Sequence, residues 1–568
     1  MINGFPASAA WRAAIRWSCL GTALLLPIQA SAPTDQPLLA ILQGELKREF
    51  DVLKTKGNPA PYFLAYEVTE EQSDTVMASL GALLEKGHER ARGFDTTLRV
   101  GSPKFDNYHP YRGQQVRFTT FTSLSLDDDA NQIRRALWAE TDKVYRAASR
   151  RYLQLETDRE LLAKQDRQDA DFSSEEPAQS ISEAETYRYE MAAWARKVRA
   201  WSTEFKKYPK ILGSGVSFRA QREIRTLVNS EGSAIRQGTN LFRIEMQGGA
   251  VAPDGMELSD FTTVEATDPA HLPSDEVMRG KARALAEKLN AMVNAPPAEP
   301  IVCPAILSGR AAAVFFHEIF GHPIEGQRQK DINEGQTYAD RLNQNVMPDF
   351  ISVEFDPTRK QYDGADLIGS YRYDDEGVKA RPVKVVANGV LKSFLLSRSP
   401  VGEFVHSNGH GRRQPGFEVV ARQSNLLVES SNQVPERELR NRLIEEIKRQ
   451  NKPYGLYFEE VASGYTRTGR RGLQAFTVVP LVVYRVYPDG KPDELIRGVD
   501  IVGTRLAPFS KILATSNHAE VFNGYCGAES GSIPVSAVSP AILISEIETQ
   551  KKPNSQLQLP ILTRPEVP

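Results

Sequence analysis

Two histidines, a glutamate and a distant cysteine have the residue types of a catalytic zinc site. His317, Glu318 and His322 form a His-Glu-x-x-x-His pattern, and Cys526 lies far downstream in a predicted glycine-bracketed turn at 524–527. Imidazole and thiolate ligands favour zinc, and a catalytic zinc ion has three protein ligands and one open position. Glu318 would be the base that takes a proton from the zinc-bound water. The pattern therefore predicts zinc-assisted hydrolysis of an amide bond.

The spacing of the two histidines does not suit a regular α-helix. Residues four apart in a helix differ by about 40° around its axis, whereas residues five apart differ by about 140°. His317 and His322 would point in different directions from a straight helix. Either a π-bulge restores their register, or the helix ends at Gly321 and Pro323 pushes His322 towards an extended conformation. The sequence leaves both alternatives open.

Three further residues have alternative roles around this pattern. Glu325 is either a carboxylate that orients an imidazole ligand or a solvated side chain. A disulfide between Cys303 and Cys526 would remove the thiolate ligand, and export to an oxidising compartment would favour it. His518 is either a structural hydrogen-bonding side chain or a reserve metal ligand.

A polar loop offers candidate groups for substrate binding. His406, His410, Arg412 and Arg413 lie close together in a glycine-containing segment. An arginine fork there could hold the terminal carboxylate of a substrate. The alternative is an ordinary solvated loop.

The chain resembles the TldD/PmbA metallopeptidase family over roughly residues 300–550. The segments that carry the resemblance are 317–326, 373–377, 388–391, 397–398, 524–527 and 533–535. The resemblance implies a zinc peptidase that trims unfolded or flexible peptides inside a dimeric shell. It assigns His317, His322 and Cys526 as the metal ligands and Glu318 as the base. It also implies a homodimer or a heterodimer with a PmbA/TldE-like paralogue that lacks the ligands.

The first 32 residues are typical of a secretory signal peptide. Arg12 and Arg16 precede an apolar stretch at 17–28, and Ala30 or Ala32 would precede the cleavage site. The stretch is too short to span a bilayer. The sequence predicts a periplasmic or secreted protein without a stable membrane span, and the alternatives are an uncleaved anchor or a misassigned start codon.

Composition argues against nucleic-acid partners, and the length suits two or three domains. Lys and Arg number 70 against 72 Asp and Glu, so no basic excess favours nucleic acid. The fold class is α+β, with an N-terminal α+β domain at 33–126 and a central helical and strand region at 127–298. A strand-rich metallopeptidase domain at 299–568, which carries the metal-binding helix, follows the proline-rich boundary at 296–300.

Local patterns predict the main elements. Asp127 to Asp129 precede a long helical pattern that extends to about residue 165, and Ser274 precedes another helix. Strands are expected at 116–126, 301–307 and 542–549, and a hairpin at 383–396 turns at Asn388-Gly389.

Three functions remain compatible with these residues. The first is a zinc peptidase, the second a non-catalytic partner or scaffold subunit, and the third a metal-dependent amidase with a non-peptide substrate. A structural zinc ion usually has four protein ligands and needs no base. Three ligands beside Glu318 therefore favour a hydrolase.

Overall fold

The computed structural model describes residues 37–110, 116–158, 169–182, 185–331, 334–466, 475–504, 508–552 and 562. The signal peptide predicted at 1–32 lies outside these residues, so export stays a prediction. Long helices and many strands together confirm the α+β class. In the described ranges, no helix is both long and apolar enough to cross a membrane.

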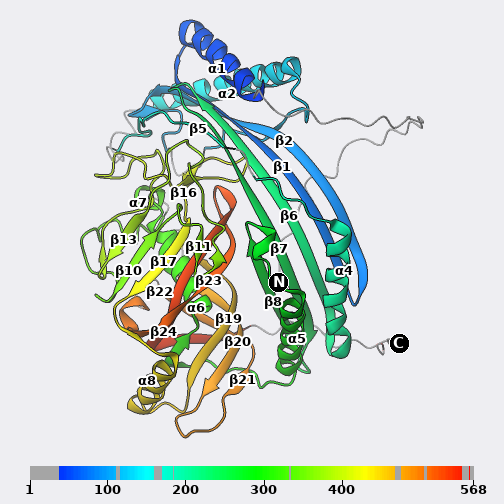
Figure 1. Cartoon of the computed structure of the whole chain (residues 1–568). Helices are drawn as coiled ribbons and strands as arrows, with labels where there is room; N and C mark the ends of the chain where they lie inside the picture. The colour runs from blue at the N-terminus through cyan, green and yellow to red at the C-terminus, as the bar shows by residue number, and fades with distance from the viewer. Residues whose placement is uncertain are drawn as a thin grey trace, which may run out of the picture.

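A long, mostly antiparallel sheet dominates the N-terminal half (Figure 1). Its described strands pair in the order β3-β2-β1-β6-β7-β5, with β4 beside β2 and β8 beside β7. Strands from both sides of residue 126 thus form one sheet, and the boundary predicted there does not separate two structural units. The strands are β1 (Pro61–Ser79), β2 (Ala82–Ser102), β3 (Phe105–Asp106), β4 (Thr122–Ser123), β5 (Gln179–Ile181), β6 (Ile211–Asn229), β7 (Ala234–Val251) and β8 (Glu257–Ala266).

Two pairs of helices bury the apolar side chains of this sheet. α1 (Pro37–Lys56) and α2 (Ala130–Thr157) share one hydrophobic core with β1 and β2. α4 (Met191–Ser202) and α5 (Asp275–Met292) share another with β6 and β7. The predicted helix starts are confirmed, because the side chains of Asp129 and Ser274 cap α2 and α5.

The strand predicted at 116–126 is wrong except for β4. The backbone N–H groups of Phe118 and Thr119 donate to the Glu418 carboxylate at 2.6 and 3.0 Å instead of pairing with a strand. This segment therefore connects the long sheet to the C-terminal half.

All the described strands of the second large sheet come from residue 302 onward. They pair in the order β14-β13-β10-β17-β24-β22-β20-β19-β9, and β24 also pairs with β9, which closes a circuit of strands. The strands are β9 (Val302–Leu307), β10 (Ile351–Phe355), β13 (Val383–Ala387), β14 (Val390–Leu391), β17 (Asn425–Ser430), β18 (Gln433–Val434), β19 (Gly455–Thr466), β20 (Ala475–Val486), β21 (Glu494–Ile496), β22 (Val499–Thr504), β23 (Ile512–Ala528) and β24 (Gly531–Lys551). Two small ribbons pair β11 (Gln361–Tyr362) with β12 (Ala365–Asp366) and β15 (Gly411–Arg412) with β16 (Val420–Ala421).

The Asn388-Gly389 hairpin is confirmed, although its second strand is shorter than predicted. Both residues have positive φ, 47° and 78°, as a type I′ turn requires. β14 ends at Leu391 rather than near residue 396. The strand predicted at 542–549 is part of the much longer β24.

A short buried helix, α6 (Gly309–Phe316), follows β9 and leads to the predicted ligands. The Ser308 side chain accepts from the Ala311 N–H at its start and donates to the Glu459 carbonyl at 2.7 Å. α6 packs against β19, β23 and β24 in the largest hydrophobic core. The other helical elements in the described part of this half are η4 (His317–Gly321), η5 (His322–Ile324), α7 (Gln327–Lys330), α8 (Glu436–Arg449) and η6 (Phe509–Lys511).

Candidate metal centre

A π-turn at the end of α6 brings the two histidines together. In η4 the N–H of His322 donates to the carbonyl of His317, five residues earlier. The π-bulge alternative is therefore confirmed. The extended alternative is wrong, because His322 has helical backbone angles, φ −61° and ψ −46°.

Three ligand atoms converge in a buried cluster. His317 Nε2 lies 3.2 Å from Cys526 Sγ, and His322 Nε2 lies 3.4 Å from the same sulfur. All three atoms lie within 4.8 Å of one another. Tetrahedral zinc with ordinary Zn–N and Zn–S bonds would separate nitrogen from sulfur by about 3.6 Å. The residues present thus fit a zinc ion.

Cys526 lies within strand β23 rather than in the predicted turn, and it pairs with Ile533 of β24. Both Cys526 and Cys303 are free and buried, so the disulfide alternative is wrong. Burial raises the pKa of Cys303 to about 12. Burial also opposes ionisation of Cys526, but the nearby positive charges of His322, His317 and Arg422 outweigh it and hold its pKa well below the usual value. Cys526 is thus the thiol suited to bind metal.

Glu318 lies beside the ligand atoms. Its carboxylate is 3.9 Å from His322 Nε2, and its side chain is 12% exposed. Strand β19 passes directly over it, since a Cβ added at Gly464 would overlap Glu318 Cγ and lie 3.1 Å from Cδ. The carboxylate is therefore confined close to the position where a metal would be bound.

Glu325 orients one imidazole. It is fully buried, lies 3.3 Å from His322 Nδ1, and accepts from Arg328 Nε at 2.8 Å. Burial would raise its pKa, but the positive charges of His322 and Arg328 lower it to about 2. The solvated alternative for Glu325 is wrong, and its contact leaves His322 Nε2 facing Cys526.

The sequence reasoning missed two residues that touch the ligands. Arg422 Nη2 donates to the Cys526 carbonyl at 2.6 Å, and Gln423 Nε2 donates to the His317 carbonyl at 3.2 Å. They are 104 and 106 residues away from those ligands in the chain. No local pattern marks them, because their partners are set by the tertiary fold.

Comparison with known proteins identifies the domain that carries this cluster. The C-terminal domain of the PmbA/TldA metallopeptidases matches residues 300–551. Residues 300–551 thus resemble the TldD/PmbA family, and the match covers less than half of the chain. A metalloprotease of Methanocaldococcus jannaschii is 29% identical over 231 residues, 40% of this chain and 47% of the relative. A zinc metalloprotease TldD homolog of Saccharolobus solfataricus is 24% identical over 248 residues, 43% of this chain and 51% of the relative. The matched segments thus span about half the length of these two relatives.

The fold of most of the chain is similar to that of solved structures. TldE from Thermococcus kodakarensis superposes with a TM-score of 0.60 at 12% identity, covering 91% of this chain and 100% of TldE. A structure from Thermotoga maritima gives a TM-score of 0.60 at 14% identity, covering 89% of this chain and 100% of that protein. Identities this low show the shared fold.

Side chains of the loop predicted to bind substrate also make internal contacts. His410 is fully buried, both of its ring nitrogens have partners, and burial lowers its pKa to about 3. Arg412 donates to the carbonyls of Gln423 and Pro534, and Arg413 pairs with Glu67 of the long sheet at 2.7 Å.

The remaining predicted side chains lie outside the cluster. His406 is exposed and lies 3.5 Å from Glu175. A substrate-binding role for the 406–413 loop therefore stays a prediction. The reserve ligand is wrong, because His518 is exposed while the three ligands are buried.

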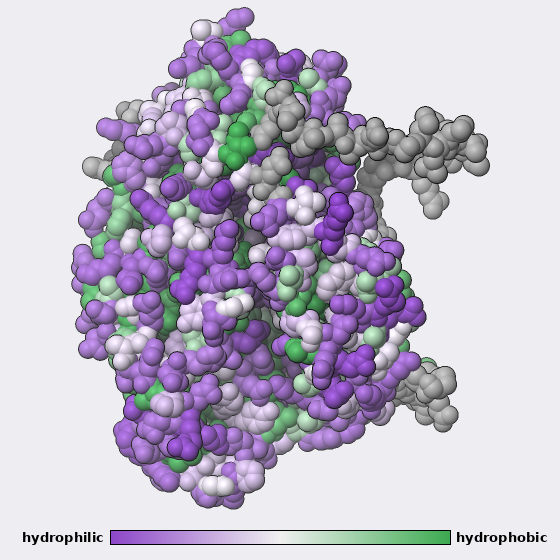
Figure 2. Space-filling model, in the orientation of Figure 1, coloured by the Kyte–Doolittle hydropathy of each residue, from purple (hydrophilic) through white to green (hydrophobic). Residues whose placement is uncertain are grey.

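The strand that carries Cys526 faces the long sheet. The Arg243 guanidinium of β7 lies 5.9 Å from the ring of Tyr525, next to Cys526 on β23. Figure 2 shows largely polar side chains over the face in view, with a hollow between the two halves of the molecule.

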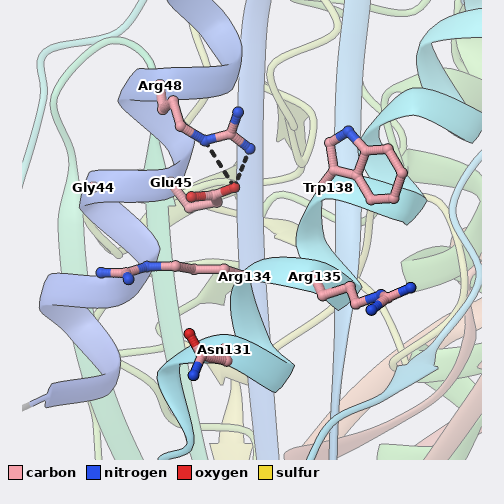
Figure 3. Close-up of a pocket in the computed structure, with 7 residues that line it drawn as sticks. All are labelled: Gly44, Glu45, Arg48, Asn131, Arg134, Arg135 and Trp138. Carbon is pink, nitrogen blue, oxygen red and sulfur yellow. Dashed lines mark hydrogen bonds and ion pairs between the residues drawn. The ribbon is translucent and has the colours of Figure 1, made fainter.

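A separate open groove lies between α1 and α2 (Figure 3). Arg48, Arg134, Arg135 and Trp138 line it, and Glu45 pairs with Arg48. It contains none of the predicted site residues.

Proposed function

We propose that this chain is a zinc-dependent peptidase that cleaves unfolded or flexible peptides. The observation that carries the proposal is the three-ligand cluster with the Glu318 carboxylate 3.9 Å from His322 Nε2. A structural zinc ion usually has a fourth protein ligand, and in the described residues this cluster has three. The metalloprotease names of the relatives support the same activity.

The side chains have distinct roles in this proposal. His317, His322 and Cys526 would hold the zinc ion, and Glu325 would keep His322 in its orientation. When bound, zinc supplies a Lewis acid that polarises the scissile carbonyl and makes water more acidic. Glu318 would accept the proton of the attacking water and deliver it to the leaving amine.

Burial of the ligands supports extended substrates. His317, His322 and Cys526 are 6%, 8% and 2% exposed, and the Cys526 strand faces the long sheet. A folded protein surface would not reach atoms this deeply buried, whereas a single extended segment would. Unfolded or flexible peptides are therefore the proposed substrate class.

The proposed working unit is a dimer, formed by two copies of this chain or with a TldE-like paralogue. The likeness of the fold to TldE supports such a pairing. The oligomeric state is measured by light scattering of the zinc-loaded protein. A monomer that cleaves peptides would reject this part of the proposal.

The activity is tested on a mixed library of unstructured peptides read by mass spectrometry. We compare the zinc-loaded wild type, Glu318→Gln and the control Glu354→Gln, whose glutamate lies on β10. Cleavage by the wild type and the control but not by Glu318→Gln, at equal zinc content, is the expected result. Equal cleavage by Glu318→Gln would reject Glu318 as the base. No peptide cleavage by any zinc-loaded protein would favour the non-catalytic partner or the amidase, and a second assay on non-peptide amides separates these two.

A further inference from the structure

The convergence of the ligand histidines depends on the π-turn. The His322 N–H donates to the His317 carbonyl across five residues. In a regular helix the same two imidazoles would point about 140° apart. Isolated π-turns are rare, and they occur frequently at functional sites. Metal binding therefore depends on whatever contacts favour this turn over a regular one.

Gln423 contacts the turn and a ligand at the same time. Its Nε2 lies 3.2 Å from the His317 carbonyl oxygen and 3.5 Å from His317 Nε2, the ring nitrogen that faces Cys526. Its Oε1 is buried and has no hydrogen-bond partner in the described ranges. A buried unpaired oxygen is unfavourable, so Oε1 does not stabilise this position of the side chain. The two Nε2 contacts with His317 are what hold the side chain in place.

Gly321 leaves the space that Gln423 occupies. A Cβ added at Gly321 would overlap Oε1 and Cδ of Gln423 and lie 2.7 Å from Nε2. The backbone of Gly321 has φ −59° and ψ −49°, which any residue adopts. Glycine destabilises a helix relative to alanine. The conformational freedom of glycine is therefore not needed here, whereas its small size is.

Gln423 has little room to move away from the turn. Residues 422–425 are all fully buried. Arg412 Nη1 donates to the Gln423 carbonyl at 2.8 Å, and β17 begins two residues after Gln423. A larger residue at Gly321 would therefore displace the π-turn rather than Gln423.

We propose that Gln423 is a positioning residue for the metal centre: it holds the π-turn that lets His317 and His322 bind one metal ion, and Gly321 makes room for it. The inference rests on the proposed metal centre. It does not depend on peptidase activity, because it predicts metal affinity.

The test measures zinc affinity of the full chain by competition with a chromophoric chelator. The absorption spectrum of the Co²⁺-substituted protein reports the coordination geometry and the thiolate bond. Gln423→Ala removes the amide and opens space, whereas Gln423→Leu removes the donor but keeps the bulk. Gly321→Ala is made in the wild type and in both Gln423 variants. Gly280→Ala is the matched control, because that α5 glycine has no atom within 4 Å of an added Cβ.

The expected results distinguish the effect of the Gln423 hydrogen bond from the effect of the space at Gly321. Gln423→Ala and Gln423→Leu weaken zinc binding by about 10–100-fold and alter the cobalt spectrum. Gly321→Ala weakens binding at least about 10-fold in the wild type. When Gly321→Ala is added to Gln423→Ala, it weakens zinc binding by less than about 3-fold, because the overlapping side chain is absent. When it is added to Gln423→Leu, it still weakens zinc binding, because the bulk of the side chain remains. Gly280→Ala leaves zinc affinity unchanged.

Several results would overturn the inference. Equal losses from Gly321→Ala in the wild type and in Gln423→Ala would do so, as would unchanged zinc affinity in Gln423→Leu. If Gly321→Ala does not fold, recovery of a folded, zinc-binding protein by adding Gln423→Ala is the expected rescue, and its failure contradicts the proposal. Zinc binding by the wild type without peptide cleavage would reject the proposed function and leave this inference standing.

Discussion

Replacement of Glu325 by glutamine tests how one ligand is held. The Glu325 carboxylate is buried against His322 Nδ1 at 3.3 Å, Arg328 Nε at 2.8 Å and Arg422 Nε at 3.4 Å. Glutamine keeps the shape of the side chain but removes the negative charge that faces these three groups. We therefore expect Glu325→Gln to weaken zinc binding and to destabilise the metal-free protein.

The size of each effect follows from the contacts. Loss of a carboxylate that orients a ligand histidine lowers metal affinity by about 10–100-fold, or about 1.4–2.7 kcal/mol. Breaking a buried ion pair costs about 3–5 kcal/mol when a charge is left unpaired. Here Arg328 keeps Glu334 at 3.2 Å and Glu529 at 2.8 Å, so the charge stays compensated. We expect a loss of about 1–3 kcal/mol in the unfolding free energy of the metal-free protein.

Chelator competition measures the affinity, and urea unfolding of the metal-free protein measures the stability. Glu529→Gln is the matched control, because Glu529 pairs with the same Arg328 and makes no hydrogen bond to His322. It should change zinc affinity by less than about 3-fold. The reasoning is refuted if Glu325→Gln binds zinc as tightly as the wild type, or if both variants lose the same affinity.

Three further changes probe the scaffold and the thiol. Ser308→Ala removes the cap that accepts from Ala311 N–H, and it should lower the unfolding free energy by about 1–2 kcal/mol in urea; an unchanged midpoint would contradict the role of the cap. Burial raises the pKa of Asp260 to about 7, while the unfolded carboxyl ionises near pH 4, so the folded state binds more protons in between and stability falls as pH rises through that window. Asp260→Asn should remove this decline between about pH 4 and about pH 7, and parallel thermal midpoints in both proteins would contradict it. Cys526→Ser should weaken zinc binding by more than about 100-fold and Cys303→Ser should not, whereas equal losses would contradict the assignment.

The local signals in the sequence were sufficient where a structure depends on neighbouring residues. Asp129 and Ser274 cap the predicted helices, and Asn388-Gly389 forms the predicted turn, because each interaction spans only a few residues. The three residues whose side chains converge were predictable from residue type. The way in which their side chains converge was not predictable, because the sequence allowed both a π-bulge and an extended His322.

Contacts between distant residues explain what the sequence could not show. The π-turn is contacted by Gln423, 106 residues after His317 in the chain. The sequence places Arg413 in a candidate substrate-binding loop, and its charge partner Glu67 is 346 residues away in the chain. Residues 116–126 alternate like a strand, yet two of their N–H groups bind Glu418. A polar side chain in a sequence does not reveal whether its partner is solvent or a distant charge.

The central claim is that His317, His322 and Cys526 bind one zinc ion and leave one position open. X-ray absorption at the zinc edge of the purified full chain tests it most directly. We expect one zinc ion with about one sulfur neighbour near 2.3 Å and about three nitrogen or oxygen neighbours at about 2.0–2.1 Å. Cys526→Ser should remove the sulfur shell. A zinc ion without sulfur, or a protein that retains no zinc, would contradict the claim.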